Sequence, residues 1–230
     1  MIFKCLFDPL WDLTFLYADE PNIVKIFERT GMPIADPLLG EAANERNVVK
    51  SLPNARIIHL ATHAGQGASA TQGDTELPSA GLADVALVFS GANLTLTGDQ
   101  RRSADPANDG ILSGYEIAHL PLSGSDLVML SACDTARGAR AGTDGLQSLG
   151  YAFHLAGIPN VLMTLWKVDD EKTSQFVTVF YEELLRLDQS DGQRDPEIFR
   201  RALRNTQTRV RGPDFRFNYW DYAAFILVEG

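Results

Sequence analysis

The chain has 230 residues, of which 45% are apolar and 22% are charged, so it is long enough for one sizeable core and has an ordinary globular composition. Its formal net charge of −10 argues against a nucleic-acid-binding surface. Two cysteines are too few for a disulfide scaffold, and no stretch reaches the roughly 20 apolar residues that span a bilayer. We therefore expect a cytoplasmic protein that contacts neither nucleic acid nor membrane.

Residues 1–33 hold a short apolar start and an amphipathic candidate helix, PNIVKIFERT, which Gly31 and Pro33 would end. We expect this segment to be an N-terminal extension or edge element, and 34–230 to be the main domain. Beyond it, helical and strand patterns alternate. Helical patterns lie near 41–52, 113–119, 144–156, 171–187 and 196–209, and strand patterns at 56–61, 85–89, 126–132, 160–165 and 219–228. This alternation predicts an α/β fold with a doubly wound, mostly parallel sheet flanked by helices.

Two long stretches, 63–84 and 92–112, are rich in Gly, Ser, Asn, Asp and Thr and are expected to be irregular. The only basic stretch is RRALRNTQTRVR at 200–211. Its apolar positions follow a helical repeat, so we interpret the arginines as the solvated face of a packed helix.

Two segments, HLATHAG at 59–65 and LSACDT at 130–135, each place a reactive side chain just past an apolar run. These side chains are His63 and Cys133. If the two runs are neighbouring parallel strands, about 4.8 Å apart, both side chains emerge at the carboxyl edge of the sheet. An imidazole and a thiol within hydrogen-bonding reach form a cysteine nucleophile and its base. His59 falls inside its strand, and His119 and His154 lie in helical patterns, so we interpret these three as packing residues.

These two motifs, followed by GTDGLQSLGYAFHLAGIPNVLMTLWKVDDEKTSQFVTVFYEELL at 142–185, resemble the CHAT domain. That family is a caspase-related peptidase module that bacteria often attach to tetratricopeptide repeats, and the resemblance runs from about Pro37 to the closing YWDYAAFILVEG. It implies a three-layer αβα, caspase-like fold and a clan CD cysteine endopeptidase that cleaves a protein partner in a bacterial regulatory or defence pathway. His63 and Cys133 would be its dyad, with no third member, metal or cofactor.

No repeat of solenoid length is visible in the chain. A tetratricopeptide-repeat or sensor partner is therefore expected on another polypeptide or on a region absent from this sequence.

The oxyanion of the reaction needs two donors, and the backbone N–H groups of Cys133 and of Ala64 or Gly65 are the candidates. The family usually has Gly directly after the histidine, whereas this chain has Ala64 and then Gly65. Alanine keeps the N–H but narrows the allowed backbone conformations.

Substrate recognition is assigned to acidic residues near the ends of the strands. Asp169 and Asp170 resemble the DD-x-x-T-S stretch of metacaspases, where an acidic residue receives an Arg or Lys side chain. Both residues are equally suited to capping the helix that follows. The substrate residue that precedes the cleaved bond is called P1. Further candidates for the site that binds its side chain are Asp134, Asp144 and Trp166, although a tryptophan at the end of a buried strand is more typical of the core.

Two other classes of function are compatible with the sequence. An inactive CHAT-fold module that binds a peptide or a partner subunit is suggested by Ala64. Acyl transfer to a non-peptide substrate would use the same dyad, but no G-x-S-x-G or G-x-C-x-G elbow supports it.

Overall fold

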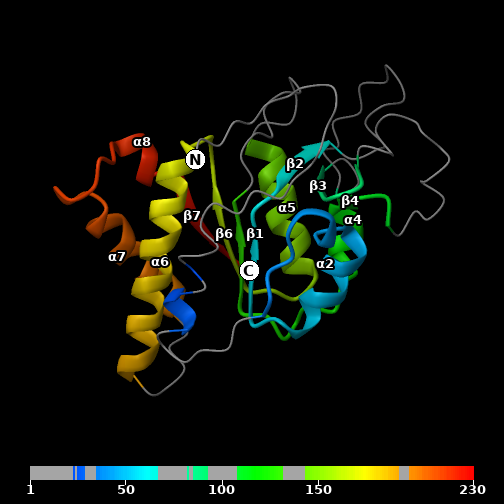
Figure 1. Cartoon of the computed structure of the whole chain (residues 1–230), viewed down its shortest axis with the longest axis horizontal. Coiled ribbons are helices and arrows are strands. Elements are labelled where there is room, and N and C mark those ends of the chain that lie inside the picture. The colour runs from blue at the N-terminus through cyan, green and yellow to red at the C-terminus, as the bar shows by residue number, and fades with distance from the viewer. Residues whose placement is uncertain are drawn as a thin grey trace.

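The computed structural model describes residues 23, 25–28, 35–66, 82, 85–92, 108–131, 143–191 and 197–230. Its main sheet has four strands in the order β1-β5-β6-β7. They are β1 (Ile57–Leu60), β5 (Leu127–Leu130), β6 (Asn160–Thr164) and β7 (Phe225–Glu229). The first three are parallel, and β7 runs antiparallel to β6 (Figure 1). The prediction of an α/β fold with a mostly parallel sheet is confirmed.

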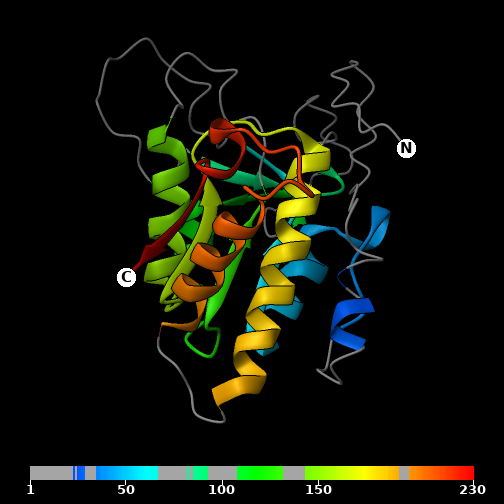
Figure 2. The ribbon, with the colours of Figure 1, turned by 90° about the vertical axis from the view of Figure 1, so that its left-hand side faces the viewer.

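Both faces of the main sheet are covered, because its strands are apolar at successive positions. Val128 and Leu130 face one core cluster, whereas Leu127 and Met129 face another. Helices α2 (Glu45–Ser51), α4 (Gly114–Ala118) and α5 (Thr143–Leu155) contribute to the first cluster. Helices α6 (Asp170–Asp191) and α7 (Ile198–Arg209) cover the second face, which gives three layers (Figure 2). Burying one such aliphatic side chain contributes about 1.5–3 kcal/mol.

A second, smaller sheet departs from the sequence-based expectation. Strands β2 (His63–Gln66), β3 (Val85–Val88) and β4 (Ile111–Ser113) form an antiparallel sheet in that order. The strand expected at 85–89 therefore lies outside the main sheet. Of the two stretches expected to be irregular, 63–84 contains all of β2 and 92–112 contains the start of β4. A four-residue apolar run does not reveal its pairing partner, so the pattern alone could not make this distinction.

The segment 219–228 also differs from the strand predicted there. Its first part is a short helix, α8 (Tyr219–Tyr222), and only the second part is β7. A capping box begins the helix, since the Asn218 side chain accepts from the backbone N–H of Asp221 and the Asp221 side chain accepts from that of Asn218. This reciprocal pair satisfies N–H groups that would otherwise lack partners. Two single turns, η1 (Gly40–Ala42) and η2 (Leu52–Asn54), flank α2.

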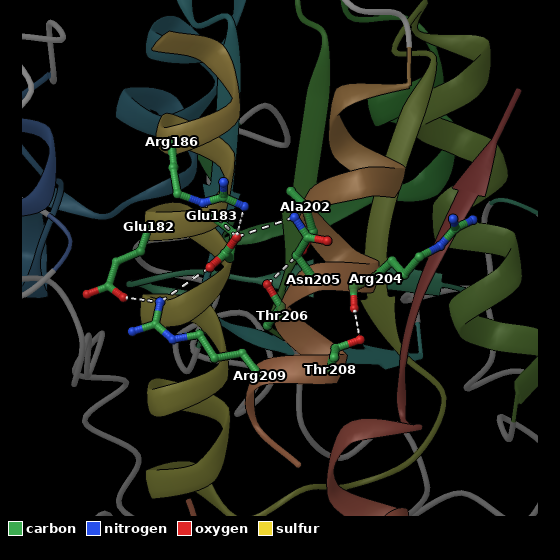
Figure 3. A network of polar contacts seen from close by, with 9 residues as sticks. All are labelled: Glu182, Glu183, Arg186, Ala202, Arg204, Asn205, Thr206, Thr208 and Arg209. Atoms are coloured by element: carbon green, nitrogen blue, oxygen red, sulfur yellow. Dashed lines mark hydrogen bonds and ion pairs between the residues drawn. The ribbon is translucent and has the colours of Figure 1, made fainter. Parts of the chain in front are cut away.

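A polar network joins α6 to α7 (Figure 3). Glu183 is 8% exposed, and its carboxylate accepts from Arg186 at 2.6 Å, from Asn205 at 3.4 Å and from Arg209 at 3.5 Å. Arg209 also pairs with Glu182 at 2.7 Å. On the inner side of α7, Phe199, Ala202 and Leu203 are buried. The interpretation of the arginine-rich stretch as the outer face of a packed helix is confirmed.

The N-terminal residues that the structure describes pack against α6. Ile23 and Phe27 are buried, and the Phe27 ring lies 5.4 Å from that of Tyr181. Among the described ranges, no helix is both long enough and apolar enough to cross a bilayer.

Candidate active site

The strands that carry the two motifs are neighbours with a fixed register. Leu60 of β1 pairs with Leu130 of β5, and the Ser131 N–H donates to the Leu60 carbonyl at 2.9 Å. This pairing offset is 70 residues (130 − 60), and His63 and Cys133 are also 70 apart (133 − 63). In the sequence, each motif residue is therefore three positions beyond the last residue of its strand. Cys133 itself lies outside the described residues.

His63 is anchored at this edge by the second sheet. It is the first residue of β2 and pairs with Val88 of β3, and the preceding Thr62 hydroxyl donates to the Val88 carbonyl. The side chain of His63 is partly buried. Two flanking structures thus fix its backbone, since β1 leads into it and β3 pairs with it.

The two adjacent aspartates after β6 have different environments. Asp169 is exposed, and its carboxylate accepts from the backbone N–H groups of Glu171 at 3.0 Å and Lys172 at 3.3 Å. It therefore caps α6. Asp170 is partly buried, and burial raises its pKa, while Lys167 and His63 act in the opposite direction. Asp170 is thus one carboxyl group, among the residues that the structure describes, within electrostatic reach of His63.

Trp166 is not a core residue. It is 36% exposed and follows β6 at the same edge of the sheet. The interpretation that favoured the core was wrong. The Leu165 N–H still donates to the Ala224 carbonyl beside β7, but the next residue, Trp166, is exposed. Asp134 lies outside the described residues, and so does the side chain of Asp144.

Strand β2 restricts which backbone group can serve as an oxyanion donor. Ala64 pairs with Leu87, and Gly65 pairs with Ala86. In an antiparallel ladder, bonded and non-bonded pairs alternate, so one of these consecutive residues directs its N–H toward β3 and the other directs it away. Only one of them is therefore available to a substrate.

The remaining histidines make structural contacts. The His59 ring lies 5.8 Å from that of Tyr181, its Nε2 is 3.3 Å from the Ser131 hydroxyl, and burial lowers its pKa to about 3. It is thus neutral and built into the strand, as expected. His154 Nδ1 lies 2.8 Å from the Ile158 carbonyl. His119 differs from expectation because it is exposed, with Nδ1 2.7 Å from the Tyr115 carbonyl.

Sequence reasoning missed two residues at this edge, Tyr219 and Trp220 of α8, which are 62% and 68% exposed. Helix α8 lies beside the N-terminal end of α6 (Figure 1), and Lys172 of α6 pairs with Asp221 at 2.5 Å. The N-x-x-D spacing of Asn218 and Asp221 was the signal that could have identified the helix.

A mostly parallel sheet between two helical layers, with a histidine at its carboxyl edge, defines a three-layer α/β fold of the caspase-like kind. The CHAT domain family model matches residues 13–229, and the chain belongs to this family.

Two relatives are tetratricopeptide repeat proteins. Tetratricopeptide repeat protein 28 of Mus musculus is 30% identical over 161 residues, which is 65% of this chain and 6% of that protein. The protein of the same name from Homo sapiens is 27% identical over 161 residues, with the same coverage of 65% and 6%. The chain thus spans a small part of the relatives that it matches.

Proposed function

We propose that this CHAT domain is a cysteine endopeptidase that cleaves a protein partner with His63 as base and Cys133 as nucleophile. The observation that supports this most strongly is the shared offset of 70 residues, which equals both the β1–β5 register and the spacing of the two side chains. A reactive pair at the carboxyl edge of neighbouring parallel strands occupies the usual place of an α/β active site.

In the proposed reaction, the His63 imidazole accepts the Cys133 thiol proton as Sγ attacks the peptide carbonyl carbon. The oxyanion is held by the Cys133 N–H and by the N–H of Ala64 or Gly65 that points away from β3. As the C–N bond breaks, His63 returns the proton to the leaving amine. A water molecule, deprotonated by His63, then hydrolyses the thioester and releases the acid and the free thiol.

For recognition, we propose that Asp170 receives an Arg or Lys side chain at P1, with Asp134 and Trp166 nearby. Asp169 is a weaker candidate because its carboxylate already caps α6. A partly desolvated carboxylate discriminates strongly against side chains that leave it unpaired. A cytoplasmic setting, a bacterial regulatory or defence pathway and a tetratricopeptide-repeat or sensor partner belong to the same proposal.

Thiol labelling of the intact chain tests the dyad. With an iodoacetamide probe at pH 7, Cys133 should alkylate faster than glutathione, and His63→Ala should slow this reaction while leaving Cys5 unchanged. Mild oxidation should silence the thiolate reversibly. Alkylation of Cys133 that is no faster than that of glutathione and is insensitive to His63→Ala would argue against an activated nucleophile.

A second candidate is a module that binds a peptide or partner subunit without cleaving it. Ala64 favours it, because this residue stands where the family usually has Gly and is 5% exposed within the first core cluster. Binding without turnover by the wild-type chain, measured on a peptide cocktail, would select this function over the endopeptidase.

A further inference from the structure

Three large aromatic side chains are exposed together at the edge that carries His63. Trp166 follows β6, and Tyr219 and Trp220 belong to α8, which leads into β7. Their exposed fractions are 36%, 62% and 68%. Because β7 is antiparallel to β6, α8 lies at the carboxyl end of β6. We call these three residues the aromatic platform.

The platform is held in place by contacts among its own residues. The Trp166 indole N–H donates to the backbone carbonyl of Trp220 at 2.8 Å, and the two rings meet edge to face at 5.8 Å. Tyr219 and Trp220 make a similar contact at 5.7 Å. Beneath them, Asp221 both caps α8 and pairs with Lys172 of α6. Because these side chains are already ordered, a ligand that binds to them loses little further side-chain conformational entropy.

The charge around the platform selects the kind of side chain that it would take. Over 165–172 and 218–222, two lysines and four carboxylates leave a formal charge of −2 (2 − 4), which becomes −1 with Arg211 beside Tyr222, and the whole chain carries −10. Both lysines already face carboxyl groups, since Lys172 pairs with Asp221 and Lys167 acts on Asp170. An anionic occupant is disfavoured by this charge, and the Trp166 N–H is no longer free to donate to one.

An arginine of the same chain already lies over an aromatic ring next to the platform. The Arg211 guanidinium lies 5.6 Å from the ring centre of Tyr222, the neighbour of the platform on α8. Tryptophan offers a stronger face to a cation than tyrosine does. Arginine and lysine also carry long aliphatic stems that cover apolar surface while the charged end stays hydrated.

We propose that the aromatic platform binds an arginine or lysine side chain of the substrate polypeptide, at a position other than P1. That the bound polypeptide is a substrate rests on the proposed endopeptidase function. The binding of an arginine or lysine side chain to the platform does not. The platform would therefore add a second basic residue to the recognition sequence, through cation–π contact with Trp220 and Trp166.

Binding to a chain that cannot cleave tests the platform apart from catalysis. Each fluorescein-labelled peptide has Arg at P1 and one test residue that lies two, three or four positions N-terminal to P1. These three spacings are the registers compared. Anisotropy titrations use the full chain with Cys133→Ala, and compare Arg with citrulline, norleucine and Glu at the test position. In at least one register, Arg should bind about 2–30-fold tighter than citrulline, the range that a cation–π contact contributes.

Trp220→Ala in the same background should abolish this preference, and it leaves the Trp220 backbone carbonyl that Trp166 uses. Tyr151→Ala is the matched control, because Tyr151 is 57% exposed on α5, away from the platform. The proposal is overturned if Arg and citrulline bind equally in every register, if norleucine binds best, or if Tyr151→Ala has the same effect.

The two proposals fail separately in this design. If the wild-type chain neither cleaves nor shows an activated thiol, yet the preference for Arg depends on Trp220, the endopeptidase proposal fails and the platform stands. If the wild-type chain cleaves and Trp220→Ala leaves every preference unchanged, the platform fails alone.

Discussion

Asp170 and His63 interact electrostatically across two separate elements, since Asp170 begins α6 and His63 begins β2. Burial raises the pKa of Asp170, and the positive charges of Lys167 and of protonated His63 partly offset this effect. Asp170 and His63 therefore lie at one edge of the sheet. Asp170 is proposed to bind the substrate side chain, and His63 is proposed to accept the thiol proton. Asp169, its neighbour in sequence, is instead engaged with the backbone of α6.

This difference predicts unequal effects of neutralising the two aspartates. Asp170→Asn should lower kcat/KM for peptides with Arg or Lys at P1 by at least about tenfold, because a charged hydrogen-bond partner contributes about 1.5–3 kcal/mol. Asp169→Asn is the matched control, since Asn caps a helix about as well as Asp and should change little. Cleavage rates on a P1 peptide library check this. Preference for small or apolar P1 residues in the wild-type chain would contradict the acidic site.

Removing the nucleophile gives a second prediction. Cys133→Ala should lower kcat by a factor of at least about 1,000 and leave the unfolding midpoint nearly unchanged, since it removes only the sulfur atom. Turnover of the peptide cocktail and thermal unfolding measure the two effects. Cys5→Ala serves as the control thiol. Retention of most activity by Cys133→Ala, or a large loss in Cys5→Ala, would assign the chemistry elsewhere.

The main sheet could be predicted because its signal is local. Runs such as DLVMLSA are apolar at successive positions, as strands covered on both faces require, and the spacing of His63 and Cys133 already contained the register. The second sheet could not be predicted, because pairing of 63–66 with 85–88 depends on tertiary contacts. At 219–222 the aromatic residues favour a strand, but the capping box of Asn218 and Asp221 favours a helix and prevails. Exposure of Trp166 likewise depends on how the chain leaves β6.

A buried carboxyl group makes stability depend on pH. Glu45 is 2% exposed and accepts from the Gly110 N–H at 2.9 Å. Burial, with smaller contributions from Asp109 and Glu116, raises its pKa from 4.5 to about 7. The folded state therefore binds more protons than the unfolded state between these values, so stability falls as the pH rises from about 4.5 to about 7.

Glu45→Gln should remove this part of the pH dependence, because Gln is neutral and still offers an oxygen to Gly110. Urea unfolding at pH 5 and pH 8 should show a smaller loss of stability in the variant than in the wild type, by about 1–3 kcal/mol. Exposed Glu41→Gln is the control and should follow the wild type. Equal pH dependence in the wild type and Glu45→Gln would show that folding does not raise the pKa of Glu45.

The last prediction concerns the contact between α6 and α7. Glu183 accepts from Arg186, Asn205 and Arg209, so Glu183→Ala removes the hydrogen bonds to all three partners. The arginine side chains are 61% and 45% exposed and regain water when the carboxylate is lost, so the expected cost is about 1–2 kcal/mol rather than that of a fully buried pair. Glu182→Ala is the matched control, because its pair with Arg209 is exposed on both sides and should contribute about 0.5 kcal/mol or less. Chemical unfolding of the three proteins measures the difference, and equal losses in both variants would mean that burial of Glu183 adds nothing to the helix contact.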